Sequence, residues 1–117
     1  MRQTQDIELK LTNERSVPER TKLLLELSEI LYLSDTIRAI ILLQELLANY
    51  SIFLSKENPN LIAQSCLQLT KCYVLQSKNE EASDIIIKAE QLFHEIGNQK
   101  GIIDCLNIRG KILLNQG

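Results

Sequence analysis

One stretch, Gln91 to Gly110, carries most of the side chains in this sequence that could do chemistry. It holds the only histidine, His94, together with Asp104, Cys105 and three glycines. An imidazole, a carboxylate and a thiol can build a nucleophilic or metal site when they converge. His94 falls on a different predicted helix from Asp104 and Cys105, however, and the spacing is not that of a ligand set. We therefore interpret the stretch as a joint between two helices, with His94 at the surface on the side of Glu90.

The remaining sequence offers no stronger chemical motif. Cys66 and Cys72 lie six residues apart on one predicted helix, face different directions and cannot chelate together. No glycine-rich phosphate loop, HExxH or GxSxG pattern is present. We expect reduced structural thiols, no metal, no cofactor and no enzymatic activity. A small helical enzyme that uses His94 with Cys105 or Asp104 stays open as an alternative.

Length, composition and charge narrow the class of protein. The chain has 117 residues, 44% of them hydrophobic, which corresponds to one globular domain. The net charge is −2, the pI is near 5.4 and the basic residues are scattered, so we expect no nucleic-acid partner. The opening "MRQTQDIELK" is not a signal peptide, and no uninterrupted apolar run reaches the roughly 20 residues that a membrane span needs. We expect a cytoplasmic protein without membrane insertion.

The pattern of residues predicts an all-α fold. Aromatic residues make up only 4% of the chain, and unbranched helix formers dominate. Pro18 and Pro59 stand where helices can begin, and Gly97 stands where one can end. The predicted helices are 18–33, 36–55, 59–76, 79–96 and 99–115, after an N-terminal segment 1–17 that contains a short helix within 4–14. The apolar residues of 36–55 cover most of its circumference, so we expect this helix to be packed on several sides.

The helix pairs resemble a known repeat. Residues at the spacing of the tetratricopeptide pattern W-x2-L-G-x2-Y…A-x3-F are Cys66, Leu69, Thr70, Tyr73, Ala82, Ile86 and Ala89. The sequence thus resembles tetratricopeptide repeats, in a lengthened form of about 40 residues. The resemblance covers 18–117 as two antiparallel pairs, 18–55 and 59–96, and a half repeat, 99–115. It implies about two and a half repeats in a right-handed superhelical stack.

Two further expectations come with this resemblance. Gly97, Asn98 and Gly101 are expected to shape the turn between two units. Small residues, among them Ala82 and Gly110, are expected to let antiparallel helix backbones approach each other.

The resemblance also implies a role. Lengthened repeats of this kind commonly form the N-terminal regulatory or sensory segment of bacterial diguanylate or adenylate cyclases, sensor kinases and transcription regulators. They bind a protein or peptide in a concave groove that is lined by the first helix of each pair. The candidate groove residues are Tyr32, Gln64, Gln68, Lys71, Asn107 and Lys111. Lys71 and Lys111 occupy equivalent positions and should attract an acidic ligand. A solvated face without a ligand is the alternative.

The last predicted helix suggests self-association. Leu106, Gly110 and Leu113 form an apolar face whose repeat partner is missing, and exposed apolar faces tend to find cover. We expect a two-fold homodimer through this helix or through the apolar helix 36–55. In the alternative, residues 1–17 fold back over the core and the chain stays monomeric. A free-standing helical dimeriser or adaptor, with no groove ligand, is accordingly the second hypothesis for function.

Overall fold

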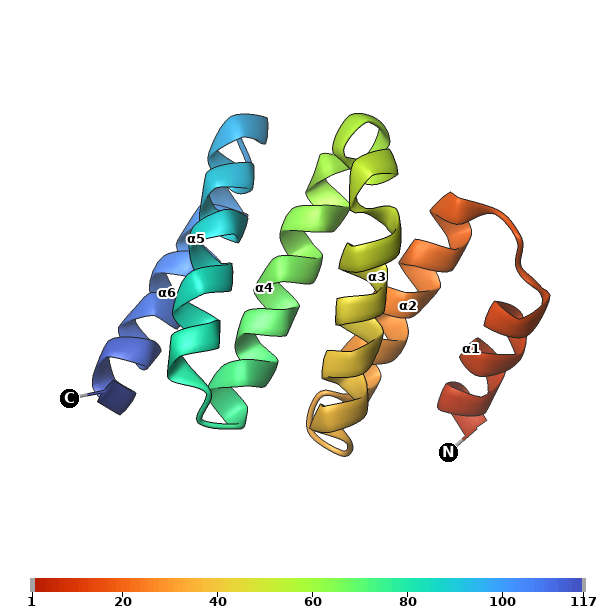
Figure 1. The fold of residues 1–117 in the computed structure, drawn as a ribbon, viewed down its shortest axis with the longest axis horizontal. Helices are drawn as coiled ribbons and strands as arrows, with labels where there is room; N and C mark the ends of the chain where they lie inside the picture. The colour runs from red at the N-terminus through yellow and green to blue at the C-terminus, as the bar shows by residue number, and fades with distance from the viewer. Residues whose placement is uncertain (1, 117) are drawn as a thin grey trace.

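A computed structural model describes residues 2–116 and is all-helical over that range (Figure 1). The helices are α1 (Arg2–Asn13), α2 (Val17–Leu31), α3 (Thr36–Glu57), α4 (Pro59–Leu75), α5 (Asn79–Ile96) and α6 (Gln99–Gln116). The all-α prediction is confirmed, and each predicted boundary lies within about two residues of the observed one. The end of the predicted domain, Gly117, lies outside the described residues.

Local capping explains why the helices begin where they do. Asn58 precedes α4, and its side-chain oxygen accepts a hydrogen bond of 3.2 Å from the backbone N–H of Leu61. Asp35 caps α3 in the same way, with the N–H of Arg38 at 3.2 Å. Each cap satisfies one of the N–H groups that the first helical turn leaves without a partner. Pro59 follows its cap at a position where no donor is needed.

The joint between α5 and α6 has the geometry that the resemblance implied. Gly97 ends α5 in the left-handed conformation, with φ at 72°. The side-chain oxygen of Asn98 accepts from the N–H of Gly101 at 3.0 Å, and its amide nitrogen donates to the side chain of Asn60 at 2.9 Å. The joint therefore turns the chain and also ties it to the start of α4.

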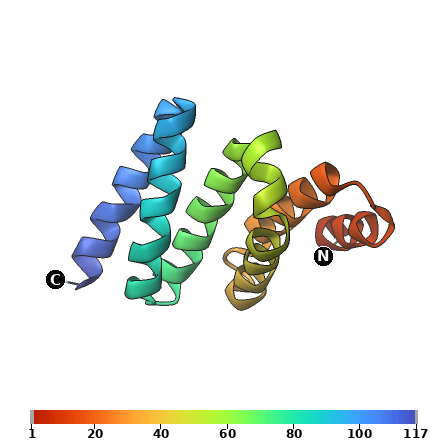
Figure 2. The ribbon, with the colours of Figure 1, turned by 45° about the horizontal axis from the view of Figure 1, so that its top comes forward.

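Helix α4 lies at the centre of the arrangement. It packs against α2, α3, α5 and α6, which is more neighbours than any other helix has within the described chain. Helices α2 and α3 form one antiparallel pair and α4 and α5 the next, followed by α6 (Figures 1 and 2). Helices α2, α4 and α6 contact one another in series and form one layer. Paired helices in a row are the arrangement that the repeat hypothesis requires; the handedness of a longer stack stays a prediction.

Two expectations about packing were wrong. Helix α3 is not packed on several sides, because Ile37, Ile41 and Ile52 point away from its neighbours, Ile52 with 85% of its surface exposed. The helix that is packed on several sides is α4. Ala82 is buried between helices as expected, but Gly110 is not: it is exposed, and a Cβ atom placed on it would meet nothing within 4 Å.

Helix α3 is also apolar enough to raise the question of a membrane span. Among the described residues it is the one helix whose length and composition pass such a test, with a mean hydropathy of 1.5 over 18 residues. Only 28% of that window is buried. The buried residues, such as Leu43 and Leu46, belong to the core that α3 shares with α2 and α4.

The N-terminal segment forms a helix that covers one end of the row. Ile7 of α1 is buried in the core. Arg20 of α2 donates hydrogen bonds to the carbonyl oxygens of Leu11, at 2.7 Å, and Glu14, at 3.0 Å. Helix α1 packs on α2, at the opposite end of the row from α6 (Figures 1 and 2). The N-terminal segment thus folds back over the core, as the alternative expected, but it covers the end formed by α2 and leaves α6 exposed; whether the chain is monomeric stays a prediction.

The tight contact at the joint gives a testable prediction. A Cβ atom on Gly101 would lie 2.4 Å from the ring of Phe93, which is 1% exposed and has no room to retreat. Gly101→Ala should therefore lower the free energy of unfolding by about 1–3 kcal/mol, as overpacking does. Gly110→Ala is the matched control, because that site is open, and it should gain roughly 0.5–1 kcal/mol from helix propensity alone. Urea unfolding followed by circular dichroism measures both; equal effects would contradict the contact.

Candidate binding groove

A hollow of about 250 Å³ opens where α2, α4 and α6 meet, and we call it the inner groove. Helix α4 supplies its floor and α2 and α6 its two walls. The lining residues are Leu25, Glu29, Gln64, Leu67, Gln68, Lys71, Phe93, Asn98, Lys100, Gly101 and Asp104. Because α2, α4 and α6 are the first helices of successive pairs, this is the layer that the resemblance assigned to ligand binding.

Gln68 is the most unusual residue of the inner groove. Only 7% of it is exposed, yet its amide makes no side-chain hydrogen bond within residues 2–116, and it lines the hollow. Its amide atoms still reach the solvent of the hollow, because they are not among the fully buried polar atoms without a partner. Other buried polar groups of α4 bond within the helix, since Ser65 and Thr70 each donate to a carbonyl oxygen one turn back. The Gln68 amide is thus left available to a molecule in the groove.

Charges of both signs stand around this amide. Lys71 and Glu29 line one part of the groove, and Lys100 and Asp104 line the part formed by α6. The pKa of the Glu29 carboxyl is raised, because partial burial outweighs the lowering effect of the nearby Lys71 ammonium. The groove therefore offers two cations, two carboxylates and amide groups, together with the apolar surfaces of Leu67 and Phe93.

The structure brings together only part of the predicted set. Gln64, Gln68 and Lys71 line the inner groove as predicted. Tyr32 does not, because it packs against the core at the end of α2. Asn107 and Lys111 are exposed on α6 but lie outside the groove, because α6 lines it only with its first two turns.

Sequence reasoning missed two of the charged groups in the groove. Glu29 lies three residues before Tyr32, and Lys100 lies seven residues before Asn107. Lys100 comes two residues after the Asn98 cap, so the joint itself was the signal that could have found it. Lys100, rather than Lys111, is the second lysine of the site.

The candidate catalytic residues of the opening stretch are not brought together. His94 lies on the outer side of α5 beside Glu90, as predicted, and near Arg109. Asp104 lines the inner groove and Cys105 is fully buried. Over the described residues, no group of three His, Cys, Asp or Glu side chains could hold a metal ion. The geometry therefore does not bring His94 together with Asp104 or Cys105.

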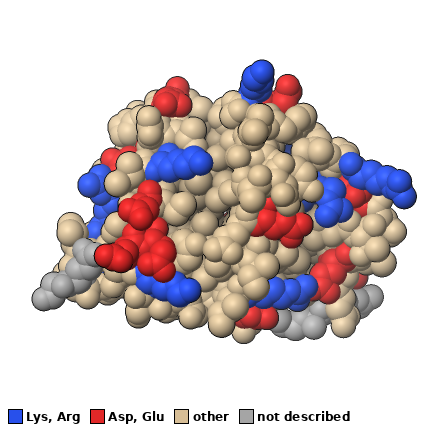
Figure 3. Space-filling model, in the orientation of Figure 1, with Lys and Arg blue, Asp and Glu red and all other residues tan. Residues whose placement is uncertain are grey.

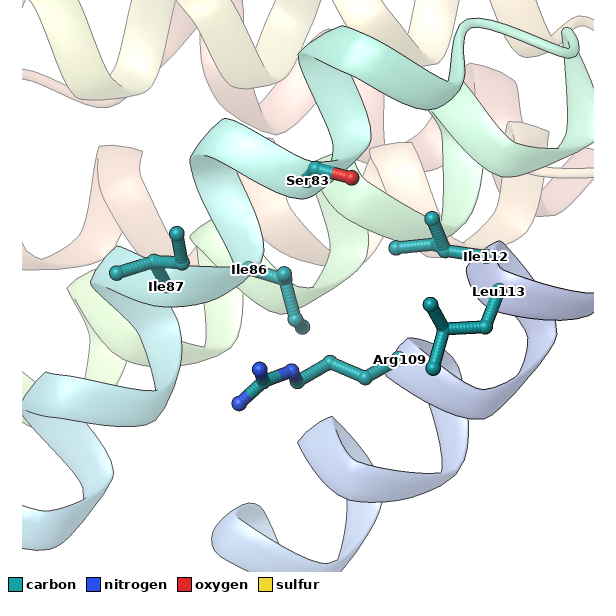
Figure 4. Close-up of a pocket in the computed structure, with 6 residues that line it drawn as sticks. All are labelled: Ser83, Ile86, Ile87, Arg109, Ile112 and Leu113. Carbon is teal, nitrogen blue, oxygen red and sulfur yellow. The ribbon is translucent and has the colours of Figure 1, made fainter. Parts of the chain in front are cut away.

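A second, smaller hollow of about 140 Å³ lies between α5 and α6. Ile86 and Ile87 of α5 and Arg109, Ile112 and Leu113 of α6 line it, and Figure 4 shows these side chains extending into the gap from both helices. The lining is mostly aliphatic, so this cleft suits an apolar side chain rather than a polar ligand.

Surface charge on the face that carries α3 and α5 is mixed. Figure 3 shows acidic side chains gathered over part of α5, with basic and acidic groups scattered elsewhere among uncharged residues. Glu80 and Glu81 contribute acidic charge in the first turn of α5. A phosphate backbone binds to an extended basic surface, and this face does not present one.

Comparisons with known proteins add no further identification: no protein-family model matches the chain, and neither a curated protein nor a solved structure matches it significantly. The resemblance to tetratricopeptide repeats therefore stays a prediction. It accounts for the helix pairs, the joint and the layer that carries the inner groove.

The three thiols are free and fully buried. Burial raises the pKa of Cys66, Cys72 and Cys105 to about 11 in each case, and nearby carboxylates add to the shift of Cys105. At pH 8 a thiol with such a pKa is a thiolate in roughly one molecule in a thousand, against one in ten at a pKa of 9. None of the three is suited to act as a nucleophile or a metal ligand at neutral pH.

Alkylation tests this assignment. In the native protein at pH 8, all three cysteines should react with iodoacetamide at least ~100-fold more slowly than in guanidinium chloride, because burial and protonation both protect them. Mass spectrometry of timed samples counts the modified sites, with glutathione as the reference thiol. A cysteine that is labelled at the same rate in both conditions would show that its thiol is accessible.

Proposed function

We propose that this chain is a protein–protein or peptide interaction module that binds an extended peptide segment in the inner groove. The Gln68 amide carries the proposal. Its carbonyl oxygen can accept and its NH2 group can donate, and the N–H and C=O of one residue in an extended backbone can pair with both. An extended segment laid across α4 would thus replace solvent at both groups of Gln68 with hydrogen bonds to the peptide.

The charges around Gln68 support a peptide rather than a uniformly charged ligand. Lys71 and Lys100 can pair with acidic side chains, and Glu29 and Asp104 with basic ones. A segment that carries both signs matches the groove, whereas a polyanion would be repelled by the two carboxylates. Because these charged groups lie near the surface, added salt should lower the affinity for the peptide. The position of the bound segment should stay the same.

A regulatory role extends this proposal. On the resemblance alone, we propose that the module is the N-terminal regulatory or sensory segment of a larger bacterial signalling protein, such as a diguanylate or adenylate cyclase, sensor kinase or transcription regulator. Its natural reading frame tests this part: an output domain downstream supports it, and a stop codon there favours the second candidate.

The second candidate function is a free-standing helical dimeriser or adaptor without a groove ligand. It is favoured by α6, where Leu106 and Leu113 remain 53% and 69% exposed. The two candidates differ in which surface is needed. Peptide binding depends on the inner groove, and dimerisation depends on the outer side of α6.

Substituting Gln68 separates binding from folding. Gln68→Leu keeps the volume and removes an amide that makes no side-chain hydrogen bond within the described chain, so stability should change little, while a groove peptide should bind at least tenfold more weakly, about 1.4 kcal/mol. The probes are peptides selected from a random phage-displayed library on the wild-type chain. Their affinity is measured by fluorescence anisotropy, and stability by urea unfolding.

Gln91→Leu is the matched control, because Gln91 is an exposed glutamine on the outer side of α5. It should leave the affinity of the same peptides unchanged. If Gln68→Leu binds them as tightly as the wild type does, or if no peptide is selected at all, the inner groove is not the binding site.

A further inference from the structure

The outer side of α6 carries an apolar stripe of Ile103, Leu106, Gly110, Leu113 and Leu114, which we call the outer stripe. The spacing of its members places them on one face of the helix, opposite the buried residues Cys105, Ile108 and Ile112. Each of its four aliphatic side chains is more than half exposed, and Leu114 reaches 81%. Helix α6 ends the row in Figures 1 and 2, and of the described helices only α5 approaches the stripe, at its edge beside Leu113.

We propose that the outer stripe binds a second copy of this chain, with the two α6 helices antiparallel. The two-fold axis crosses the stripe at the level of Ile108 along the helix. In this register Leu106 of each copy lies over Gly110 of its mate, and Ile103 over Leu113. Gly110 is open, since a Cβ atom there would meet nothing within 4 Å, so it forms the recess into which a leucine fits. The stripe is therefore complementary to itself in shape, as a two-fold interface requires.

Charge supports the same arrangement. The outer stripe itself contains no charged residue over its whole length. Arg109 stands at its edge and is already paired with Glu90 of α5, at 2.8 Å. This pair lies beside the outer stripe and not within it, so the centre of the interface stays apolar. No uncompensated charge is buried.

The area decides how tight the dimer can be. The exposed aliphatic side chains of the outer stripe amount to roughly 300 Å² of apolar surface per copy, a size at which patches on soluble proteins begin to mark interaction sites. Two copies with a polar rim bury on the order of 1,000 Å², at the small end of specific interfaces. We expect a reversible dimer with a dissociation constant in the micromolar range, about 1–100 μM.

The exposed side of α3 does not form an equivalent surface. Its apolar residues fall into two groups, Ile37 and Ile41 near the start and Ile52 with Phe53 near the end. The exposed Glu45 lies between them on the helix. A charge in the middle of the face would be buried by a second copy, at a cost that nothing nearby offsets. The structure thus selects α6 over α3, which the sequence left open.

Complementary charge substitutions test both the interface and its register. Leu106→Lys and Gly110→Glu should each weaken self-association at least tenfold, because each puts two unpaired charges into the interface. An equal mixture of the two variants should associate again as a heterodimer. In this heterodimer the ammonium group introduced at position 106 of one copy faces the carboxylate introduced at position 110 of the other. The second, symmetry-related contact is the native one between Leu106 and Gly110. Sedimentation velocity at about 5–500 μM measures the masses.

Controls keep folding apart from association. Both sites are exposed in the single chain, so circular dichroism should show unchanged helix content and melting for each variant. Ile41→Lys, at a similarly exposed isoleucine of α3, should leave the dimer intact. A wild-type monomer at every concentration, or single variants that dimerise like the wild type, would overturn the proposal. Single variants that dissociate without recovery on mixing would overturn the antiparallel register.

Discussion

The structure depends on one constraint: α4 is surrounded by α2, α3, α5 and α6, so nearly every side of it must be packed. A helix in that position has little room for long side chains between itself and its neighbours. Helix α4 meets this with small residues, among them Ala63 and Cys66, which are fully buried and allow close approach of the adjacent backbones. Its buried hydroxyls are satisfied within the helix: Ser65 donates to the carbonyl of Leu61 at 2.7 Å and Thr70 to that of Cys66 at 2.8 Å. Polar atoms can thus lie in the core without partners from other helices.

Gln68 departs from this rule on the same helix. Its side chain is too long to bond back to the backbone in the way that serine and threonine do, and it lies where α2 and α6 diverge around α4 and leave the inner groove. Its amide lies open to the hollow and makes no side-chain hydrogen bond within the described chain. A hollow that offers a few accessible polar groups beside apolar surface is typical of a binding site. We therefore base the proposed binding site on the accessible amide of Gln68, in the layer that the repeat resemblance would assign to a ligand.

Periodicity and capping made most of the fold predictable from sequence. Asn58 with Pro59, and Gly97 with Asn98, are local signals whose geometry is determined within a few residues, so the helix boundaries followed from them. The packing of whole helices was not predictable in the same way, because it depends on partners distant in sequence. The apolar residues of α3 suggested a surrounded helix, yet the fold surrounds α4, whose small residues were the better signal. The lining of the hollow was predicted only in part for a related reason: the template indicated the layer that contains it, but the place where α2, α4 and α6 meet decides which residues line it.

The two proposed surfaces use opposite sides of α6 and need not compete. Asp104 faces the inner groove, whereas Leu106 belongs to the outer stripe on the other side of the same helix. A two-fold dimer through the outer stripe would leave both inner grooves open and hold them at a fixed separation. Two linked sites bind a ligand with two suitable segments far more tightly than one site does, because the second contact is made at a high effective concentration. Such a ligand would in turn stabilise a weak dimer, which would dissociate when the ligand is absent. The reason is that the free-energy coupling between ligand binding and dimerisation acts equally in both directions. In this arrangement α6 would couple peptide binding to self-association without any change in its own fold.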